Sequence, residues 1–328
     1  MSESRIAIRT KNLTKFYAEF EAVHDLSLEI PEGTIFGFIG PNGAGKTTTI
    51  RMLCGLLKPT GGEAYVSGID VRGNSRDIKK IVGYLPDFFG TYDRMRVWEY
   101  LDFFGAAYRM PRRERRERIE HALEIAGAHH MRDLFVGSLS KGMRQRVGIT
   151  KTLIHDPSML ILDEPTSGLD PMARIEIREL LKKLKNEGGR KRTIMISSHI
   201  LPELGTICDE VGIIEKGRLL AYGPIKKILS EISQTRQVHI EFLEKSREAA
   251  DYLARLPEVS NVKVVANLVQ LEFQGDDAKA ADILRDLVGK GHSVSWMREV
   301  EADLEDVFIR VTGRAKNAEE AVQAGGGK

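Results

Sequence analysis

The fold of this chain is decided by one stretch, GPNGAGKT at residues 40–47. It follows a short, apolar, β-rich run at residues 34–39 and precedes an expected helix at residues 48–55. The stretch fits the pattern GxxxxGK[ST] in full, and between a strand and a helix that pattern indicates a phosphate-binding loop. Glycines let backbone N–H groups close around phosphate oxygens, while the helix N-terminus adds free donors and partial positive charge. The stretch therefore predicts an α/β domain that binds a nucleotide.

Two further apolar runs end in polar residues. Residues 159–162 lead into Asp163 and Glu164, and residues 193–197 lead towards His199. Such runs are typical of parallel strands buried on both faces, whose carboxyl ends line a ligand crevice. Because a phosphate loop lies upstream, we interpret one acid as a magnesium ligand through its water shell and the next as a general base. The alternative, a helix cap or a surface acid pair, is disfavoured by that loop.

Composition indicates a soluble chain with a real core and no global charge. The 328 residues are 42% hydrophobic and 29% charged, with a net charge of +2. The two cysteines, Cys54 and Cys208, lack a CxxC spacing, so we expect small buried residues in a reducing compartment. The first ten residues contain no secretory signal, and no uncharged apolar run is long enough to span a bilayer. These features predict a cytosolic protein.

The order of patterns predicts two domains and a tail. We expect an ATPase-type domain at residues 5–229, with an inserted helical lobe at about residues 88–150. Residues 230–313 alternate in the order β-α-β-β-α-β, which is the split βαβ arrangement of a ferredoxin-like domain. Residues 314–328 carry little apolar surface and are expected to be disordered.

Further motifs follow one another in a recognisable order. LSKGMRQR at residues 139–146 precedes Glu164, SGLD at residues 167–170 follows it, and Tyr17 lies upstream of the phosphate loop. This set resembles the ATP-binding subunit of ABC transporters, with LSKGM in place of the usual signature LSGGQ. The resemblance covers about residues 5–225.

The departures from the usual family pattern are specific. Asp87 stands where most of the family carries Gln, and Lys141 and Met143 replace a Gly and the Gln of the signature. A carboxylate can still bind magnesium or water, although it donates no hydrogen bond while ionised. Acids at this position and a KGM signature resemble the ABC-2 exporter branch of daunorubicin-resistance-type ATPases. Residues 304–313 are similar to the carboxyl-terminal ending of that branch.

The resemblance implies a P-loop ABC ATPase domain, with a mainly parallel sheet and an inserted helical lobe, followed by the ferredoxin-like domain. It implies ATP hydrolysis that powers export of an unknown substrate through a separate membrane permease of ABC-2 type. It also implies homodimerisation on ATP binding, a place at the cytoplasmic face of the membrane through the permease, ATP and Mg²⁺ as ligands, and no nucleic-acid partner. The residues implied are Glu164 and His199 for catalysis; Tyr17, Gly40, Pro41, Asn42, Gly43, Ala44, Gly45, Lys46, Thr47, Thr48, Asp87, Ser140, Gly142, Asp163 and Asp170 for nucleotide binding; and Thr47, Asp87 and Asp163 for magnesium.

A soluble ABC ATPase that remodels nucleic acid or ribosomes is the main alternative. The arginine-rich residues 112–118 favour it, but acids interleave with the arginines at helical spacing, which predicts an ion-paired, solvated face. The segment between phosphate loop and signature is too short for a long coiled coil, and the chain carries a single ATPase domain. A small-molecule kinase has no need of Ser140 or Asp170.

Aromatic residues gather between residues 84 and 108. We expect Tyr100, Phe103 and Phe104 to form the core of the lobe, because they lie at helix spacing. Residues 87–96 lack a helical period, so we expect Phe88 and Phe89 to be exposed and to contact the permease. The whole cluster comprises Tyr84, Phe88, Phe89, Tyr92, Trp98, Tyr100, Phe103, Phe104 and Tyr108.

Overall fold

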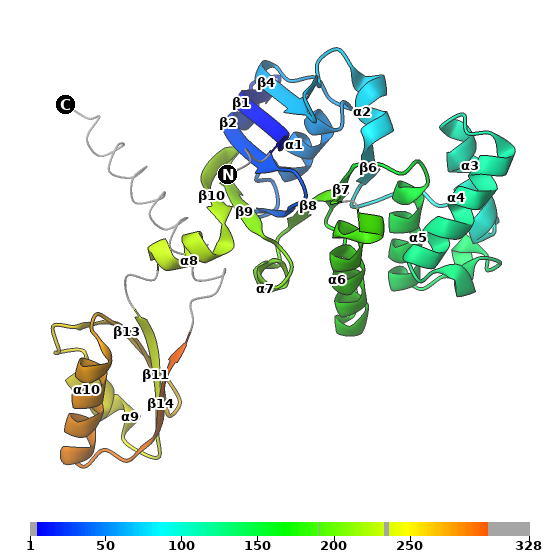
Figure 1. The fold of residues 1–328 in the computed structure, drawn as a ribbon. Helices are drawn as coiled ribbons and strands as arrows, with labels where there is room; N and C mark the ends of the chain where they lie inside the picture. The colour runs from blue at the N-terminus through cyan, green and yellow to red at the C-terminus, as the bar shows by residue number, and fades with distance from the viewer. Residues whose placement is uncertain (1–4, 190, 233–235, 301–328) are drawn as a thin grey trace. The chain divides into compact units, whose positions relative to one another are not determined.

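The computed structural model describes residues 5–189, 191–232 and 236–300 (Figure 1). It divides into two compact units, Met1–Ile225 and Lys226–Lys328. The expected last helix, the carboxyl-terminal motif at residues 304–313 and the tail from residue 314 lie outside the described residues.

The first unit contains two sheets (Figure 1). The larger has the order β10-β9-β3-β8-β7-β6, in which β10 is antiparallel to β9 and the other neighbours are parallel. The smaller is antiparallel, in the order β2-β1-β4-β5. The strands are β1 (Ile6–Tyr17), β2 (Phe20–Pro31), β3 (Ile35–Ile39), β4 (Gly61–Val66), β5 (Ile69–Asp70), β6 (Val82–Leu85), β7 (Met159–Asp163), β8 (Thr193–Ser198), β9 (Glu210–Glu215) and β10 (Arg218–Pro224).

Most helices of this unit connect the parallel strands. Three of them, α3, α4 and α5, lie in the chain between the neighbouring strands β6 and β7, as an insertion of helices into the parallel order. The helices are α1 (Lys46–Leu53), α2 (Ser75–Ile81), α3 (Val97–Ala107), α4 (Arg112–Ile125), α5 (Lys141–Leu153), α6 (Pro171–Lys185) and α7 (Leu201–Gly205), with short 3₁₀ turns at His129–Met131, Val136–Ser138 and Glu187–Gly189. Helix α8 (Ile225–Ile232) spans the boundary between the two units.

The burial of these elements follows from their sequences. Every residue of β3, β7 and β8 is buried, as expected for apolar strands covered on both faces. One apolar cluster joins buried residues of β2, α1 and β3, among them Leu28, Ile50 and Phe36, and so holds the phosphate-loop helix to the sheets. The predicted α/β architecture with a mainly parallel sheet is therefore confirmed.

After α8, the described residues of the second unit form a four-stranded antiparallel sheet with two helices. Its sheet order is β12-β13-β11-β14, and its element order is β-α-β-β-α-β, which together make the ferredoxin-like arrangement. Buried residues alternate along β11, so that one face of the sheet packs against the apolar sides of the helices. The elements are β11 (Arg236–Phe242), α9 (Ser246–Leu253), β12 (Val259–Val265), β13 (Leu268–Phe273), α10 (Asp277–Gly289) and β14 (Val294–Val300).

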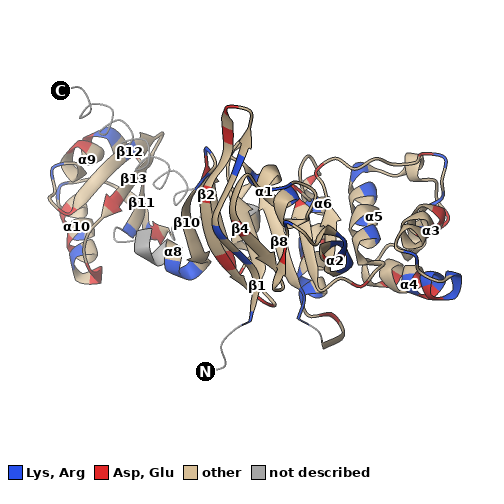
Figure 2. Cartoon of the chain, turned by 90° about the horizontal axis from the view of Figure 1, so that it is seen from above, with Lys and Arg blue, Asp and Glu red and all other residues tan. Residues whose placement is uncertain are grey.

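The charged helix α4 has the ion-paired face that its sequence predicts. Figure 2 shows basic and acidic residues interleaved along it. Arg113 lies 3.2 Å from Glu117 one turn away, and Arg115 lies 2.5 Å from Asp102 of α3. Among the helices of the described residues, none is both long and apolar enough to cross a bilayer.

The expectations for the aromatic cluster are partly wrong. Tyr100 is fully buried, but Phe103 is 44% exposed, because helix spacing alone does not say which face of α3 meets the protein. Phe88 is 89% exposed as expected, whereas Phe89 is half-buried. The ring of Phe89 fills the space above Gly148 of α5, where a Cβ would lie only 2.6 Å from it.

Candidate nucleotide site

At two positions of the phosphate loop, the backbone leaves room for no residue larger than glycine. Gly45, which caps α1, has φ 102°, and a Cβ there would lie 2.5 Å from the carbonyl oxygen of Ala22. A Cβ on Gly40 would lie 2.3 Å from the carbonyl oxygen of Ile214. A side chain at either point would displace the loop, so the glycines keep its N–H groups free to face a ligand.

The ammonium group of Lys46 is held inside this loop. Lys46 is only 6% exposed, and its Nζ donates to the carbonyl oxygens of Gly40, at 2.6 Å, and Pro41, at 3.2 Å. Its Nζ also lies 3.4 Å from Oε1 of Glu164, which is buried and has no hydrogen-bond partner among the described residues. A buried cation fixed among carbonyl oxygens is well placed for phosphate oxygens.

The two acids are fixed by the register between β7 and β8. Asp163 pairs with Ser197, whose hydroxyl donates to Oδ1 of Asp163 at 2.6 Å and accepts the N–H of Glu164 at 3.0 Å. Glu164 itself has φ 51°, a strained conformation for a side chain of this size. Its Oε2 lies 2.8 Å from Nδ1 of His199, so one carboxylate contacts both His199 and Lys46.

A cavity of about 290 Å³ gathers most of the predicted nucleotide residues. Tyr17, Asp87 and Glu164 line it together with the loop. Its complete lining is Tyr17, Phe20, Ala22, Pro41, Asn42, Gly43, Ala44, Gly45, Lys46, Thr47, Thr48, Asp87 and Glu164. Gly40 and Asp163 lie behind it, through the contacts with Lys46 and with the backbone of Glu164 described above.

Three contributors to this site were not predicted: Phe20, Ala22 and Ser197. Phe20 pairs with Tyr17 across the hairpin of β1 and β2, which places both rings on the same edge of the cavity. Ser197 acts through Asp163, a contact that depends on the order of strands in the sheet. No sequence motif marks a supporting residue such as Ser197.

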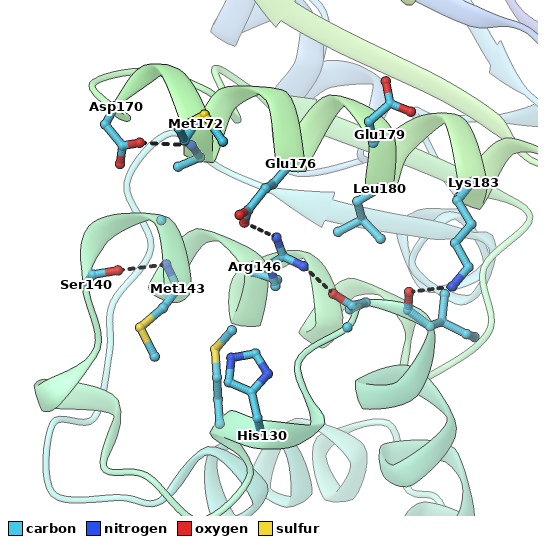
Figure 3. A pocket seen from close by; sticks show the side chains of 16 residues that line it. His130, Ser140, Met143, Arg146, Asp170, Met172, Glu176, Glu179, Leu180 and Lys183 are labelled. Carbon is cyan, nitrogen blue, oxygen red and sulfur yellow. Dashed lines mark hydrogen bonds and ion pairs between the residues drawn. The ribbon is translucent and has the colours of Figure 1, made fainter.

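The signature residues line a different cavity of the same chain. Ser140, Gly142 and Asp170 border a cavity of about 680 Å³ between α5 and α6 (Figure 3). Ser140 caps α5 by accepting the N–H of Met143 at 3.2 Å, and Asp170 caps α6 by accepting the N–H of Ala173 at 2.9 Å. Within one chain, the predicted nucleotide residues therefore fall into two groups.

Figure 3 also shows how this second cavity is held together. Arg146 of α5 reaches across to Glu176 of α6 and donates to the carbonyl oxygen of Ala126 at 3.1 Å. The cavity is thus bounded by rigid helices whose N-termini both lie at the end that carries Ser140 and Asp170.

Comparison with known proteins supplies two family matches and close full-length relatives. Residues 23–167 match the ABC transporter family, and residues 223–312 match the carboxyl-terminal domain of DrrA1-3-like ATP-binding proteins. The bacitracin transport ATP-binding protein BcrA of Bacillus licheniformis is 36% identical over 93% of this chain and 97% of its own length. The Nod factor export ATP-binding protein I of Cupriavidus metallidurans is 36% identical over 94% and 97%.

A solved structure shares the fold of the first unit. The dimeric ATP-binding cassette bound to ADP and Pi, in a post-hydrolysis state, superposes with a TM-score of 0.59 and 27% identity. The superposition covers 66% of this chain and 98% of the cassette.

Proposed function

Because this chain belongs to the family of ABC transporter ATP-binding proteins, and so is the ATP-hydrolysing motor subunit of a transporter, we propose that it powers export through a separate ABC-2 membrane subunit. The name of one relative, the Nod factor export protein, supports this direction, and the names of both relatives support a role in transport. They also disfavour the alternative role in remodelling nucleic acid or ribosomes. We propose that the chain lies at the cytoplasmic face of the membrane, bound to that subunit.

ATP binds in the cavity of the phosphate loop. The loop N–H groups and Lys46 contact the phosphates, and Tyr17, with Phe20 beside it, offers a ring face to the base. Glu164 accepts a proton from the attacking water, because its carboxylate lines the cavity beside the phosphate loop and lies next to the ammonium group of Lys46. His199 positions that carboxylate through Oε2.

The residues beside the loop also fit a magnesium ion. The hydroxyl of Thr47 lines the cavity, and the carboxylate of Asp163 is oriented by Ser197. Asp87 supplies a second carboxylate at the cavity. These hard oxygen donors suit Mg²⁺, which when bound neutralises the charge that develops on the phosphates. All three residues are proposed ligands, directly or through water.

One observation carries the proposal for assembly: the loop and the signature line separate cavities of one chain. We propose that two protomers meet head to tail, so that Ser140 and Gly142 of one face the ATP held by its partner. The N-terminus of α5 then offers N–H donors and partial positive charge to the terminal phosphate. The dimeric cassette structure that shares this fold is consistent with the arrangement.

Sedimentation of the Glu164→Gln variant tests this assembly. Without the base, bound ATP is not hydrolysed, so we expect dimers with ATP and magnesium, and monomers with ADP. Lys46→Ala added to the same chain is the control, because it removes nucleotide binding and is expected to abolish the dimer. A Glu164→Gln chain that stays monomeric at every ATP concentration would contradict the proposed assembly.

A further inference from the structure

Asp87 and Lys141 are two exposed charged residues, and neither has a partner of opposite charge among the described residues of its own chain. Asp87 lines the nucleotide cavity, and across the described ranges its carboxylate takes part in no hydrogen bond or ion pair. Lys141 is the first residue of α5, between Ser140 and Gly142, and likewise has no acidic partner in the part of the chain that the structure describes. Each residue therefore lacks an opposite charge from its own chain.

The ammonium group of Lys141 lies beside Gly168 of the same chain. Its Nζ lies beside Gly168, only 2.2 Å from the position that a Cβ on Gly168 would occupy. Gly168 has no side chain, so the amine occupies that space, next to the loop that leads to Asp170. The positive charge thus lies beside the loop that leads to Asp170, while its chain neighbours Ser140 and Gly142 line the cavity.

We propose that Lys141 of one protomer forms an ion pair with the partner's Asp87 when the two close on ATP. This inference rests on the proposed head-to-tail assembly. Ser140 and Gly142 flank Lys141, and in that assembly they approach the terminal phosphate in the partner's cavity, which Asp87 lines. The same phosphate therefore brings Lys141 and Asp87 together. Because a two-fold dimer is self-complementary, the pair forms twice.

The ion pair would offset an electrostatic repulsion at the nucleotide. A carboxylate beside a triphosphate is repelled by it, and an opposite charge within a few ångströms offsets that repulsion. The usual family pattern has an uncharged residue at both positions, whereas this chain has an acid at one and a base at the other. A chain with the usual pattern would offer Asp87 no opposite charge, so the pair would also favour association with a second copy of this chain over other ATPase subunits.

A double-mutant cycle in the Glu164→Gln background tests the pair. The dissociation constant of the dimer is measured by sedimentation at saturating ATP and magnesium for Asp87→Asn, Lys141→Gln and both together. With Asp87 present, we expect Lys141→Gln to weaken the dimer roughly tenfold per pair, and so roughly a hundredfold for two pairs. With Asp87→Asn, the same change should have an effect of at most a few-fold. Lys141→Arg, which keeps the charge, should restore most of the affinity.

Two controls separate pairing from other causes. Lys11→Gln removes the same charge from an exposed residue of β1 that lines neither cavity, and should leave the dimer unchanged. Gly168→Ala places a Cβ where the amine lies and also strains a backbone with φ 64°, so it should weaken the dimer more when Lys141 is present than after Lys141→Gln.

Three results would contradict the proposed ion pair. If Lys141→Gln weakens the dimer equally with Asp87 and with Asn at that position, Lys141 contacts the phosphate rather than Asp87 and the pairing is wrong. If Lys141→Gln has no effect in either background, the pairing is also wrong, while the proposed assembly stands. A Glu164→Gln parent that never dimerises would overturn the assembly and the pairing together.

Discussion

At the scale of single residues, the carboxylate of Glu164 is the centre of the site, because it touches both Lys46 and His199. We expect Glu164→Gln and His199→Ala to retain ATP binding and to lower turnover about 100-fold or more, the usual loss when a base or its orienting group is removed. Lys46→Ala should instead lose binding. Equilibrium binding of a fluorescent ATP analogue and steady-state ATPase rates separate the two effects. Near-normal turnover of His199→Ala would make His199 a structural residue.

His155 gives a prediction for pH. Its ring stacks on Tyr108 at 4.1 Å, and burial lowers the pKa of His155 from 6.5 to about 4. Between these values the unfolded chain takes up a proton that the folded chain does not, so the free energy of unfolding falls as pH drops from 6.5 to 4. We expect this part of the pH dependence to vanish in His155→Gln. Urea unfolding midpoints at pH 7, 5.5 and 4.5 measure it. An unchanged pH profile in the variant would assign the acid sensitivity to other groups.

The sequence shows at this scale which residues carry chemistry, but not which residues support them. Lys46 and the phosphate loop follow from a local pattern, because the strand, loop and helix are consecutive in the chain. Ser197 depends on which strands are neighbours and in what register, and that is a property of the whole sheet. The burial of Phe89 similarly depends on Gly148, a residue of a distant helix.

At the scale of elements, the loop between β6 and α3 joins the nucleotide cavity to the surface of the helices. Asp87 lines the cavity, Phe88 is 89% exposed, and Phe89 packs between Gly148 and the ammonium group of Lys151, which lies 5.1 Å from its ring centre. These three consecutive residues thus connect the nucleotide cavity to an exposed ring, which we propose as part of the docking surface for the membrane subunit. Of the two rings, that of Phe88 is the exposed one.

Phe88→Ala should therefore leave the ATPase activity of the isolated subunit nearly unchanged and abolish co-purification with its membrane subunit, since exposed rings supply much of the contact area at interfaces. Leu243→Ala, at an exposed apolar residue of the second unit, is the control and should retain the complex. Retention of the complex by Phe88→Ala would move the docking surface elsewhere.

Phe89→Ala should behave differently from Phe88→Ala, because its ring is half-buried. We expect a loss of about 2 kcal/mol in the free energy of unfolding, roughly half of what a fully buried Phe contributes. Chemical denaturation of both variants measures this contrast. Equal stability of the two variants would mean that the contact of Phe89 with Gly148 contributes little.

Helices and strands could be predicted from the sequence where the pattern of apolar residues within one segment identifies them. The all-apolar strands β3, β7 and β8 and the alternating strands of the second unit follow directly from periodicity. The antiparallel sheet of β1, β2, β4 and β5 was not predicted, because its two hairpins are joined only by the pairing of β1 with β4, which lies far along the chain. The exposed side of α3 could not be assigned for the same reason.

At the scale of the whole molecule, we propose that the two units are separate domains, since each has a buried apolar cluster of its own. A chain that ends after residue 232 retains α8, with buried Ile225 and Ile228, and removes the ferredoxin-like unit. It should fold cooperatively and bind ATP like the full chain, as judged by thermal unfolding with and without nucleotide. An insoluble product, or one that ATP does not stabilise, would mean that the units share one core.

The central claim is that ATP is hydrolysed in a site that two chains complete. The most direct test is the ATPase rate per chain, at saturating ATP and magnesium, measured over a wide range of protein concentrations with sedimentation at each. Because only dimers carry a complete site, we predict that the rate per chain rises with concentration and levels off where dimers predominate. A rate per chain that stays constant down to concentrations at which every molecule sediments as a monomer would contradict the claim.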